Sequence, residues 1–557
     1  MDAGSGRKGG TLVNTSSWVL KDIAVSLDDL APATEWALLH QLAANTMRIP
    51  VEAISTLAIL RESLDARRRD RMAIHYSLLV TLSDKLKRQP ANANRYQVEP
   101  VLPAAVASGD SGFRYASTRP VIVGAGPCGL FCALALAQAG VPAIVLERGK
   151  PVEQRQADVM AYWHAGQLNP ESNVQFGEGG AGTFSDGKLT TRIHDPRCDK
   201  VLETFVACGA PPETRWRAKP HLGTDVLAPL LVQLRKQLVS LGTTFLFQTR
   251  MDELLLANGR VVGVRLADGT VIDTETVALA IGHSARDTFS MLHDKGVVMT
   301  PKPFSVGVRI EHPQALINQA RYGGRSHYKL GAAEYQLFER FPDRTAYTFC
   351  MCPGGTVVAA ASEPQTIVTN GMSDSTRQGG NANSAFVVSV DATDVGHQPL
   401  DGVAFQRRLE QAAFHLGGST GAAPVQCLAD FLVGRPTVRF GTVQPTYTGN
   451  TEKARLDEAL PGVITARLRE AVPAFARRIN GFSLPDALLT GYETRTSSPV
   501  RMIRNAAFQA EGLFGLYPAG EGAGYAGGIM SAAVDGLRVA EAMLGKGENR
   551  TDGEGAH

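Results

Sequence analysis

The densest run of apolar residues lies at 121–146, and glycines divide it into three parts. The β-branched run at 121–123 and the apolar run at 143–146 have the length and composition of strands buried on both faces. Between them, the apolar stretch at 130–138 has the length of a helix. The pattern predicts a strand–turn–helix–strand unit. Its glycines and Pro142 argue against one continuous helix crossing a membrane.

Weaker patterns predict the other elements of the chain. In the N-terminal part they predict strands at 18–25 and 73–80 and helices at 34–42 and 50–64. After the apolar run they predict a helix at 225–241, a strand at 243–248, hairpin turns at Gly259-Arg260 and Asp268-Gly269, and a buried strand at 276–285. Further along they predict strands at 304–310, 346–351, 356–361 and 385–390, helices at 402–416 and 462–475, and a C-terminal helix at 529–544.

This order of elements predicts an α/β chain with a nucleotide-binding domain interrupted by a second domain. The texture changes near Pro301, where strand-like runs are broken by glycine and asparagine, and returns to its earlier form after 489. We therefore predict a small N-terminal α/β domain, a linker, a discontinuous nucleotide-binding domain, an inserted mixed α+β substrate domain and a disordered tail. Their bounds are 1–100, 101–118, 119–300 with 490–545, 301–489 and 546–557.

Composition and charge narrow the class of protein. The 557 residues are 44% hydrophobic and 20% charged, with 57 glycines, which is typical of a soluble α/β protein. A net charge of +2 argues against bulk attraction to nucleic acid or membranes. Seven scattered cysteines indicate free thiols in a reducing compartment, which we expect to be the cytoplasm, or a plastid if the source is a photosynthetic eukaryote. The histidines show no metal-binding spacing, so we expect no metal site.

The turn between the first strand and helix predicts the principal binding site. Gly124 permits a tight turn, Gly126 lets the backbone approach a pyrophosphate, and Gly129 lets the helix pack closely on the strand. Glu147 ends the next strand, where a carboxylate can accept hydrogen bonds from the ribose hydroxyls. The same glycine spacing recurs elsewhere, but only here does it lie between a strand and a helix. Dinucleotide binding follows from that context.

Three other stretches leave alternatives open. The glycine-rich loop at 177–182 either packs against a flat or charged group or is a structural turn. The arginine cluster at 65–71 is either a solvated turn or a contact for RNA or phosphate. Cys350 and Cys352 alternate along a predicted strand, so both thiols would leave the same face, and no cation is near them in sequence. We therefore predict a structural pair of thiols and not a redox pair.

Several longer strings extend these motifs, among them NVQFGEGGAGTFSDGKL, GHSARDTFSML, TFCMCPGGTVVAAASE and YPAGEGAGYAGGI. With GAGPCGL, they resemble the predicted FAD-dependent dehydrogenases that carry a small N-terminal domain, within the glutathione-reductase-type FAD-binding superfamily. The resemblance implies a Rossmann-like FAD-binding domain and FAD as the cofactor. It implies no substrate.

Carried onto this chain, the resemblance assigns each part of the cofactor a set of residues. Gly124, Gly126 and Gly129 would hold the diphosphate, Glu147 the ribose, and the turn at Gly520 and Glu521 the ribityl side. Glu521 stands where the superfamily usually has aspartate. The full set of expected FAD contacts is Gly124, Ala125, Gly126, Pro127, Gly129, Glu147, Arg148, Gly180, Gly182, Thr183, Gly282, Gly520, Glu521, Gly527, Gly528 and Ile529. Lys188 is the candidate catalytic residue, to stabilise negative charge near the flavin ring.

The sequence therefore predicts an FAD-dependent oxidoreductase that transfers a hydride between non-covalent FAD and a small-molecule substrate. The alternative is an FAD-dependent RNA-modifying or RNA-binding protein that docks RNA through its N-terminal domain. No second nucleotide-binding unit is evident, so electrons would come from the substrate, from transiently bound NAD(P)H or from a protein partner. The substrate and the oligomeric state stay open.

Overall fold

The computed structural model describes residues 17–83, 98–100 and 118–545. The predicted tail at 546–557 and the predicted linker at 101–118, apart from Thr118, lie outside the described residues. The chain divides into two compact units. Within the described residues, no helix is long and apolar enough to cross a membrane.

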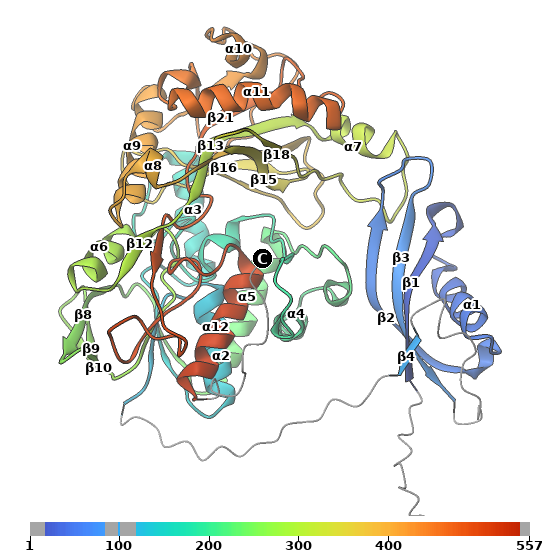
Figure 1. The fold of residues 1–557 in the computed structure, drawn as a ribbon, viewed down its shortest axis with the longest axis horizontal. Helices are drawn as coiled ribbons and strands as arrows, with labels where there is room; N and C mark the ends of the chain where they lie inside the picture. Colours follow the sequence, from blue (N-terminus) through green and yellow to red (C-terminus); the bar gives the residue numbers. More distant parts are fainter. Residues whose placement is uncertain (1–16, 84–97, 101–117, 546–557) are drawn as a thin grey trace, which may run out of the picture. The chain divides into compact units, whose positions relative to one another are not determined.

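The first unit contains a four-stranded antiparallel sheet and one α-helix (Figure 1). The strand order is β2-β3-β1-β4. Its elements are β1 (Ser17–Ser26), α1 (Glu35–Met47), β2 (Ile54–Asp65), β3 (Ala73–Leu82) and β4 (Val98–Pro100). The predicted strands at 18–25 and 73–80 and the predicted helix at 34–42 are confirmed.

The helix predicted at 50–64 is wrong, because these residues form a short 3₁₀ turn followed by strand β2. The segment contains Leu, Ala, Arg and Glu, which favour helix locally. Pairing with β3 overrides that preference: the register runs from Ile54 opposite Leu82 to Asp65 opposite Ala73. β2 lies at the sheet edge and leaves most of its side chains partly exposed, so it lacks the apolar alternation of a half-buried strand.

The arginine cluster of this unit lies at the turn between β2 and β3. Arg67 donates to Asp65 at 2.9 Å, and Asp70 lies 3.7 Å from both Arg68 and Arg71. These side chains are paired with acids of the same turn, as the solvated-turn interpretation expects.

A five-stranded parallel sheet organises the second unit, in the order β23-β11-β5-β6-β7. Its strands are β5 (Val121–Val123), β6 (Ile144–Leu146), β7 (Thr244–Leu246), β11 (Val277–Leu279) and β23 (Leu516–Pro518). Every residue of β5, β11 and β23 is buried, as expected of strands covered on both faces. β23 brings the C-terminal part of the chain into the same sheet as the first glycine turn.

Helices α2 (Pro127–Gln138) and α12 (Ile529–Met543) pack against each other beside this sheet (Figure 1). A β-carbon on Gly536 would lie 2.1 Å from the carbonyl oxygen of Cys128, so the two helices approach at backbone distance. Because β5 and β23 are parallel members of one sheet and each is followed by its helix, both helices begin at the carboxyl edge of the sheet. The other helices of this region are α3 (Val152–Ala165), α4 (Arg197–Ala207), α5 (Thr224–Ser240) and α6 (Arg286–Asp294).

Two smaller sheets accompany the parallel one. The predicted hairpin turns connect the strands of a three-stranded antiparallel sheet. Its strands are β8 (Met251–Ala257), β9 (Arg260–Leu266) and β10 (Val271–Asp273). A second pair joins β12 (Met299–Pro301) to β22 (Val500–Met502), which brings both ends of the predicted inserted domain together.

A seven-stranded sheet contains most strands between Phe304 and Glu493, in the order β14-β15-β18-β13-β21-β19-β20. Its strands are β13 (Phe304–Pro313), β14 (Phe338–Arg340), β15 (Thr345–Cys352), β18 (Asn381–Val390), β19 (Ala423–Cys427), β20 (Thr451–Lys453) and β21 (Leu488–Glu493). A separate two-stranded sheet joins β16 (Thr356–Ala359) and β17 (Thr369–Met372). The helices are α7 (Gln314–Tyr322), α8 (Ala392–Val395), α9 (Asp401–Leu416), α10 (Leu428–Val433) and α11 (Gly462–Arg478). The predicted bounds 301–489 of an inserted domain stay a prediction.

Candidate active site

A cavity of about 1620 Å³ lies at the carboxyl edge of the parallel sheet. Of the predicted site residues, those that line it are Gly124, Gly126, Pro127, Glu147, Arg148, Gly180, Gly182, Lys188, Gly282, Glu521, Gly527, Gly528 and Ile529. Ala125, Gly129, Thr183 and Gly520 do not line it. Residues after 300, including Tyr347 and Cys350, form another part of the wall.

The glycine turn after β5 is shaped by close backbone contacts. Gly124 has a φ of +107°, and a β-carbon on it would lie 2.3 Å from the carbonyl oxygen of Ala280. A β-carbon on Gly129 would lie 1.9 Å from the carbonyl oxygen of Gly124. A β-carbon on Gly126 would meet only the Cα of Gly180, at 3.9 Å. Gly124 and Gly129 are therefore required for packing, whereas Gly126 leaves room beside the glycine-rich loop.

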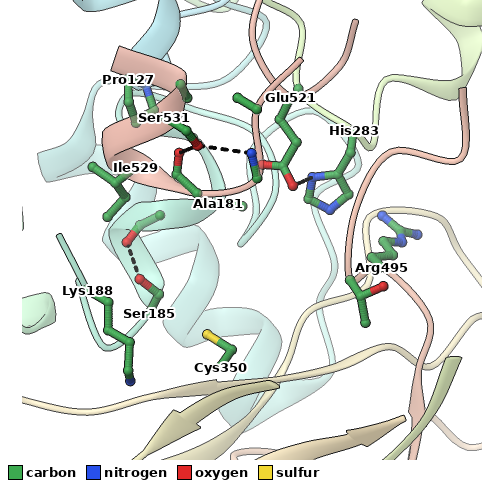
Figure 2. A pocket seen from close by; sticks show the side chains of 18 of the residues that line it. Pro127, Ala181, Ser185, Lys188, His283, Cys350, Arg495, Glu521, Ile529 and Ser531 are labelled. Carbon is green, nitrogen blue, oxygen red and sulfur yellow. Dashed lines mark hydrogen bonds and ion pairs between the residues drawn. The ribbon is translucent and has the colours of Figure 1, made fainter. Parts of the chain in front are cut away.

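The N-termini of α2 and α12 face the cavity, and so does that of α6, whose N-cap residue is Ala285. The N-cap residues of α2 and α12 are Gly126 and Gly528, both of which line the cavity, and neither provides a side-chain capping bond. The first-turn N–H groups of a helix have no partner within the helix and carry a partial positive charge. This end of the cavity therefore suits an anionic group. Figure 2 shows Pro127, Ile529 and Ser531 together on this wall.

The Glu147 carboxylate binds three backbone N–H groups. Oε2 accepts from Ala125 at 2.8 Å, and Oε1 accepts from Gly149 and Gly177 at 2.9 Å each. An ionised carboxylate has roughly four acceptor positions, so about one is left for a ligand. Glu147 thus fastens the glycine turn to the end of β6 and to the glycine-rich loop, a role that the sequence does not indicate.

Three other predicted contacts are committed to the protein itself. Arg148 donates to Glu171 at 2.7 Å and to Asp287 at 3.0 Å. The Thr183 hydroxyl donates to the Glu178 carbonyl at 3.3 Å. The Gly520 N–H donates to Asp535 at 2.7 Å. Arg148 lines the cavity, whereas Thr183 and Gly520 do not.

Glu521 and His283 point toward one another in the cavity (Figure 2), with Oε1 and Nδ1 3.8 Å apart. Burial raises the pKa of Glu521 to about 7, and burial together with Arg495 and Arg286 lowers the pKa of His283 to about 3. Because the imidazole is neutral at physiological pH, this contact is not an ion pair. His283 Nε2 is buried and has no hydrogen-bond partner among the described residues. The pair therefore offers an unused polar atom and a carboxyl group that titrates near neutrality.

Lys188 lies in the cavity wall and is held by its neighbours. Its ammonium group lies 2.6 Å from Asp186 and donates to the Met351 carbonyl. Burial opposes its charge, but the nearby Cys352 and Asp186 raise the pKa of Lys188 above its ordinary value. Asp186 also binds Arg377, and its pKa is lowered because these two cations outweigh its burial. Lys188 is therefore a fixed positive charge.

The regular alternation predicted at Cys350 and Cys352 is wrong. Phe349 lies opposite Ala385 and Cys352 opposite Asn383, so the register of β15 shifts between them. Cys350 has a φ of +45°, which is the left-handed region. It lines the cavity, whereas Cys352 is fully buried and does not. No cation lies near Cys350 in sequence, as expected, but the fold brings Lys188 and Arg309 close to it, and both lower the pKa of Cys350.

Sequence reasoning missed several residues that line the cavity, notably His283, Arg377 and Arg495. His283 directly follows Gly282, the predicted turn after β11, and that position was the available signal. Arg377 and Arg495 give no local signal, because folding alone brings them to the wall. Among the described residues, no group of three or more His, Cys, Asp or Glu side chains is arranged to hold a metal ion.

Comparison with known families identifies the cofactor. A model of an FAD binding domain matches 117–161, and one described as the C-terminal domain of FAD-dependent proteins matches 303–496. The protein is an FAD-dependent flavoprotein of the oxidoreductase class. A domain of unknown function matches 21–81.

One relative defines the family. An uncharacterized protein of Clostridium beijerinckii is 44% identical over 532 residues, which cover 95% of this chain and 98% of the relative. The chain belongs to the same family as that protein. Protein FixC of Escherichia coli is 31% identical over 206 residues, covering 35% of this chain and 44% of FixC. The L-proline dehydrogenase of P. horikoshii is 14% identical over 78% of this chain and 94% of its own, at a TM-score of 0.33, too low to support an inference about activity.

The residues of the cavity fit FAD. Gly126 and Gly180 leave a gap that any side chain would fill, and β-carbons on Gly282, Gly527 and Gly528 would meet nothing within 4 Å. The helix N-termini suit the diphosphate. The unpartnered His283 Nε2 can bind a polar group of the cofactor or of a second ligand.

Proposed function

We propose that this protein is a dehydrogenase that transfers a hydride between a small-molecule substrate and non-covalently bound FAD. The observation that carries the proposal is that the wall of the cavity of about 1620 Å³ joins the glycine turn to residues after 300. Ligand pockets typically measure roughly 300–1,000 Å³. A cavity above that range has room for a dinucleotide and a smaller molecule beside it.

In this proposal the parallel sheet and its glycine turn are a Rossmann-like unit of the glutathione-reductase type. Bound FAD supplies the acceptor or donor of the hydride. The backbone at Gly126 and the start of α2 bind the diphosphate, and the remaining acceptor position of Glu147 takes a ribose hydroxyl. Gly527, Gly528 and Ile529 bind the far end of the cofactor.

Other residues act on charge and protons. Lys188, held by Asp186, places a positive charge in the wall, which favours negative charge that develops near the ring. Glu521 has a pKa of about 7 because it is buried, so its carboxyl group can hold or accept a proton at neutral pH. The residues after 300 exclude water and position the substrate.

The charged residues at 301–489 that line the cavity support an anionic substrate. Among the described residues at 301–489, four arginines and one acid line the cavity: Arg321, Arg340, Arg377, Arg478 and Glu334. Of these arginines, Arg377 pairs with Asp186 and Arg478 with Glu339. Arginine binds carboxylate and phosphate through parallel hydrogen bonds. We therefore expect a substrate that carries a carboxylate or phosphate.

The test is anaerobic reduction of the holoprotein. Candidate carboxylate reductants, each paired with its uncharged amide, are added together with NADH and NADPH in separate arms, and flavin absorbance is followed. At least one carboxylate should bleach the flavin with saturation while its amide does not, and free FAD is the control. Failure of all substrates and nicotinamides, with dithionite still effective, would contradict the proposal. Acid precipitation should release FAD; flavin retained in the pellet would refute non-covalent binding.

A further inference from the structure

The bulge in β15 places two thiols in different surroundings at the edge of the flavin cavity. Between the pairs Phe349–Ala385 and Cys352–Asn383, three steps along β15 match two along β18. The extra residue bends the strand and re-aims its side chains. Figure 2 shows Cys350 in the cavity, on the side of Lys188. Cys352 is fully buried behind it.

The two residues remain in contact. The Cys352 thiol lies 3.3 Å from the Cys350 carbonyl oxygen, and both bind the same guanidinium group. Arg309 donates through Nη2 to that carbonyl at 2.6 Å and to the Cys352 sulfur at 3.4 Å. The bulge therefore keeps the Cys352 sulfur against the Cys350 backbone, while Cys350 alone of the two lines the cavity.

Arg309 is fixed by further contacts. Nη1 donates to Glu493 at 3.0 Å, and Nε donates to Asn383 at 2.9 Å. A β-carbon on Gly371 would lie 2.0 Å from Nη2, so glycine at that position makes room for the guanidinium. The arginine is fully buried, and its charge is therefore not screened by solvent.

The surrounding groups shift the pKa values of the two thiols in opposite directions. A hydrogen bond from Cys352 lowers the pKa of Cys350, and Lys188 and Arg309 lower it further against burial and Asp186. The pKa of Cys352 is raised by its bond to Cys350 and by burial. Glu493 and Glu521 are the other titratable groups coupled to Cys350. A thiolate beside a protonated thiol is the state from which a dithiol is oxidised.

Cys350 has a left-handed backbone conformation, which residues with a side chain rarely adopt. Left-handed φ in a residue other than glycine is uncommon and concentrates at functional sites. A regular strand would point both thiols to one face, whereas here the left-handed residue lies in the cavity wall.

From this geometry we infer that Cys350 and Cys352 are a redox-active pair that exchanges two electrons with the flavin of the same cavity. The Cys350 thiolate and the Cys352 thiol form one S–S bond and give up two electrons and the Cys352 proton. Oxidised flavin accepts both electrons and that proton. One negative charge is present before and after, so no other reactant is needed. The inference requires FAD but not the proposed substrate.

The first test counts electrons. Holoprotein is treated with diamide, freed of excess reagent and titrated anaerobically with dithionite. The wild type should take up four electrons per FAD, two for the flavin and two for the disulfide. Cys350→Ser and Cys352→Ser should each take up two. Cys427→Ser, which removes a buried thiol on β19, is the matched control and should take up four.

The second test is independent of flavin and of activity. Arg344 and Arg377 bound a tryptic peptide, Thr345–Arg377, that contains Cys350 and Cys352 and no other cysteine. After diamide this peptide should be lighter by two hydrogen atoms and resist iodoacetamide; after full reduction both thiols should be alkylated.

Three results would overturn the inference. One is uptake of two electrons by the wild type with both thiols still free after diamide. Another is a disulfide that persists once the flavin is fully reduced, because the pair would then not exchange electrons with it. The third is uptake of four electrons by either serine variant.

Discussion

Replacing Gly126 with alanine separates folding from cofactor binding. Gly126 has a φ of −76° and a ψ of −179°, a conformation that alanine adopts freely. The added β-carbon would meet only the Cα of Gly180, at 3.9 Å, which is ordinary van der Waals contact. Because alanine restricts the unfolded chain, the apoprotein should be as stable as the wild type or more stable by about 0.4–1 kcal/mol.

Binding should respond differently, since the methyl group occupies the gap in which the diphosphate is proposed to lie. A phosphate displaced from the start of α2 loses charge-assisted hydrogen bonds that contribute about 1.5–3 kcal/mol each. Loss of one or two, partly replaced by water, would weaken FAD binding by about 2–4 kcal/mol. This corresponds to a Kd about 30- to 700-fold higher.

Gly129→Ala is the matched control, because its β-carbon would lie 1.9 Å from the Gly124 carbonyl oxygen. The helix must move off the strand, so this variant should lose about 1–3 kcal/mol of folding free energy. Urea unfolding of the apoproteins measures stability, and quenching of FAD fluorescence measures Kd. Wild-type affinity in Gly126→Ala would refute the reasoning, as would an unfolding midpoint that falls as far as in Gly129→Ala.

Three further predictions follow from the geometry. Glu147→Gln sets an amide NH₂ against backbone N–H groups and should lower the unfolding free energy of the apoprotein by about 1–3 kcal/mol. The control Glu171→Gln changes partly exposed ion pairs and should lower that free energy by at most about 1 kcal/mol. Equal losses of unfolding free energy in the two variants would contradict the prediction. The pKa of Glu521 in the folded protein is about 7, above its ordinary value of 4.5. The wild type should therefore lose stability relative to Glu521→Gln as pH rises from about 4.5 to 7. Parallel profiles of unfolding free energy against pH would refute this prediction. The described cavity residues lie between 123 and 532, so a chain lacking 1–100 should still bind FAD, and a folded truncation without flavin would count against this.

Elements with a complete local signal could be predicted from sequence. The strand at 121–123, the glycine turn and helix α2 follow one another without a break, and each residue type suits its position. The same holds for α12, which begins at Ile529 as predicted, directly after its glycine turn. In both cases the apolar run is long enough, and its glycines placed clearly enough, that distant residues add no competing preference.

Contacts with residues distant in sequence determine features that local patterns cannot predict. Residues 54–65 form strand β2 because they pair with β3, although the residues themselves favour helix. Glu147 was assigned to the ribose from its position alone, yet its strongest contacts are with N–H groups of three separate segments. A local pattern identifies such a residue as polar and well placed, but only the fold determines how many of its acceptor positions remain for a ligand.

The surroundings of Cys350 and Cys352 also depend on the fold and not on their local sequence. Alternation along 348–352 predicts a shared face, but the pairing of β15 with β18 sets the register and inserts a bulge between Phe349 and Cys352. The cations near Cys350 come from a loop more than a hundred residues earlier and from β13, so sequence proximity indicates nothing about them. A buried arginine that binds one cysteine carbonyl and the other cysteine's sulfur makes the two residues a unit. The chemical state of the pair is therefore a property of the assembled sheet, and the CxC spacing alone could support neither a structural nor a redox role.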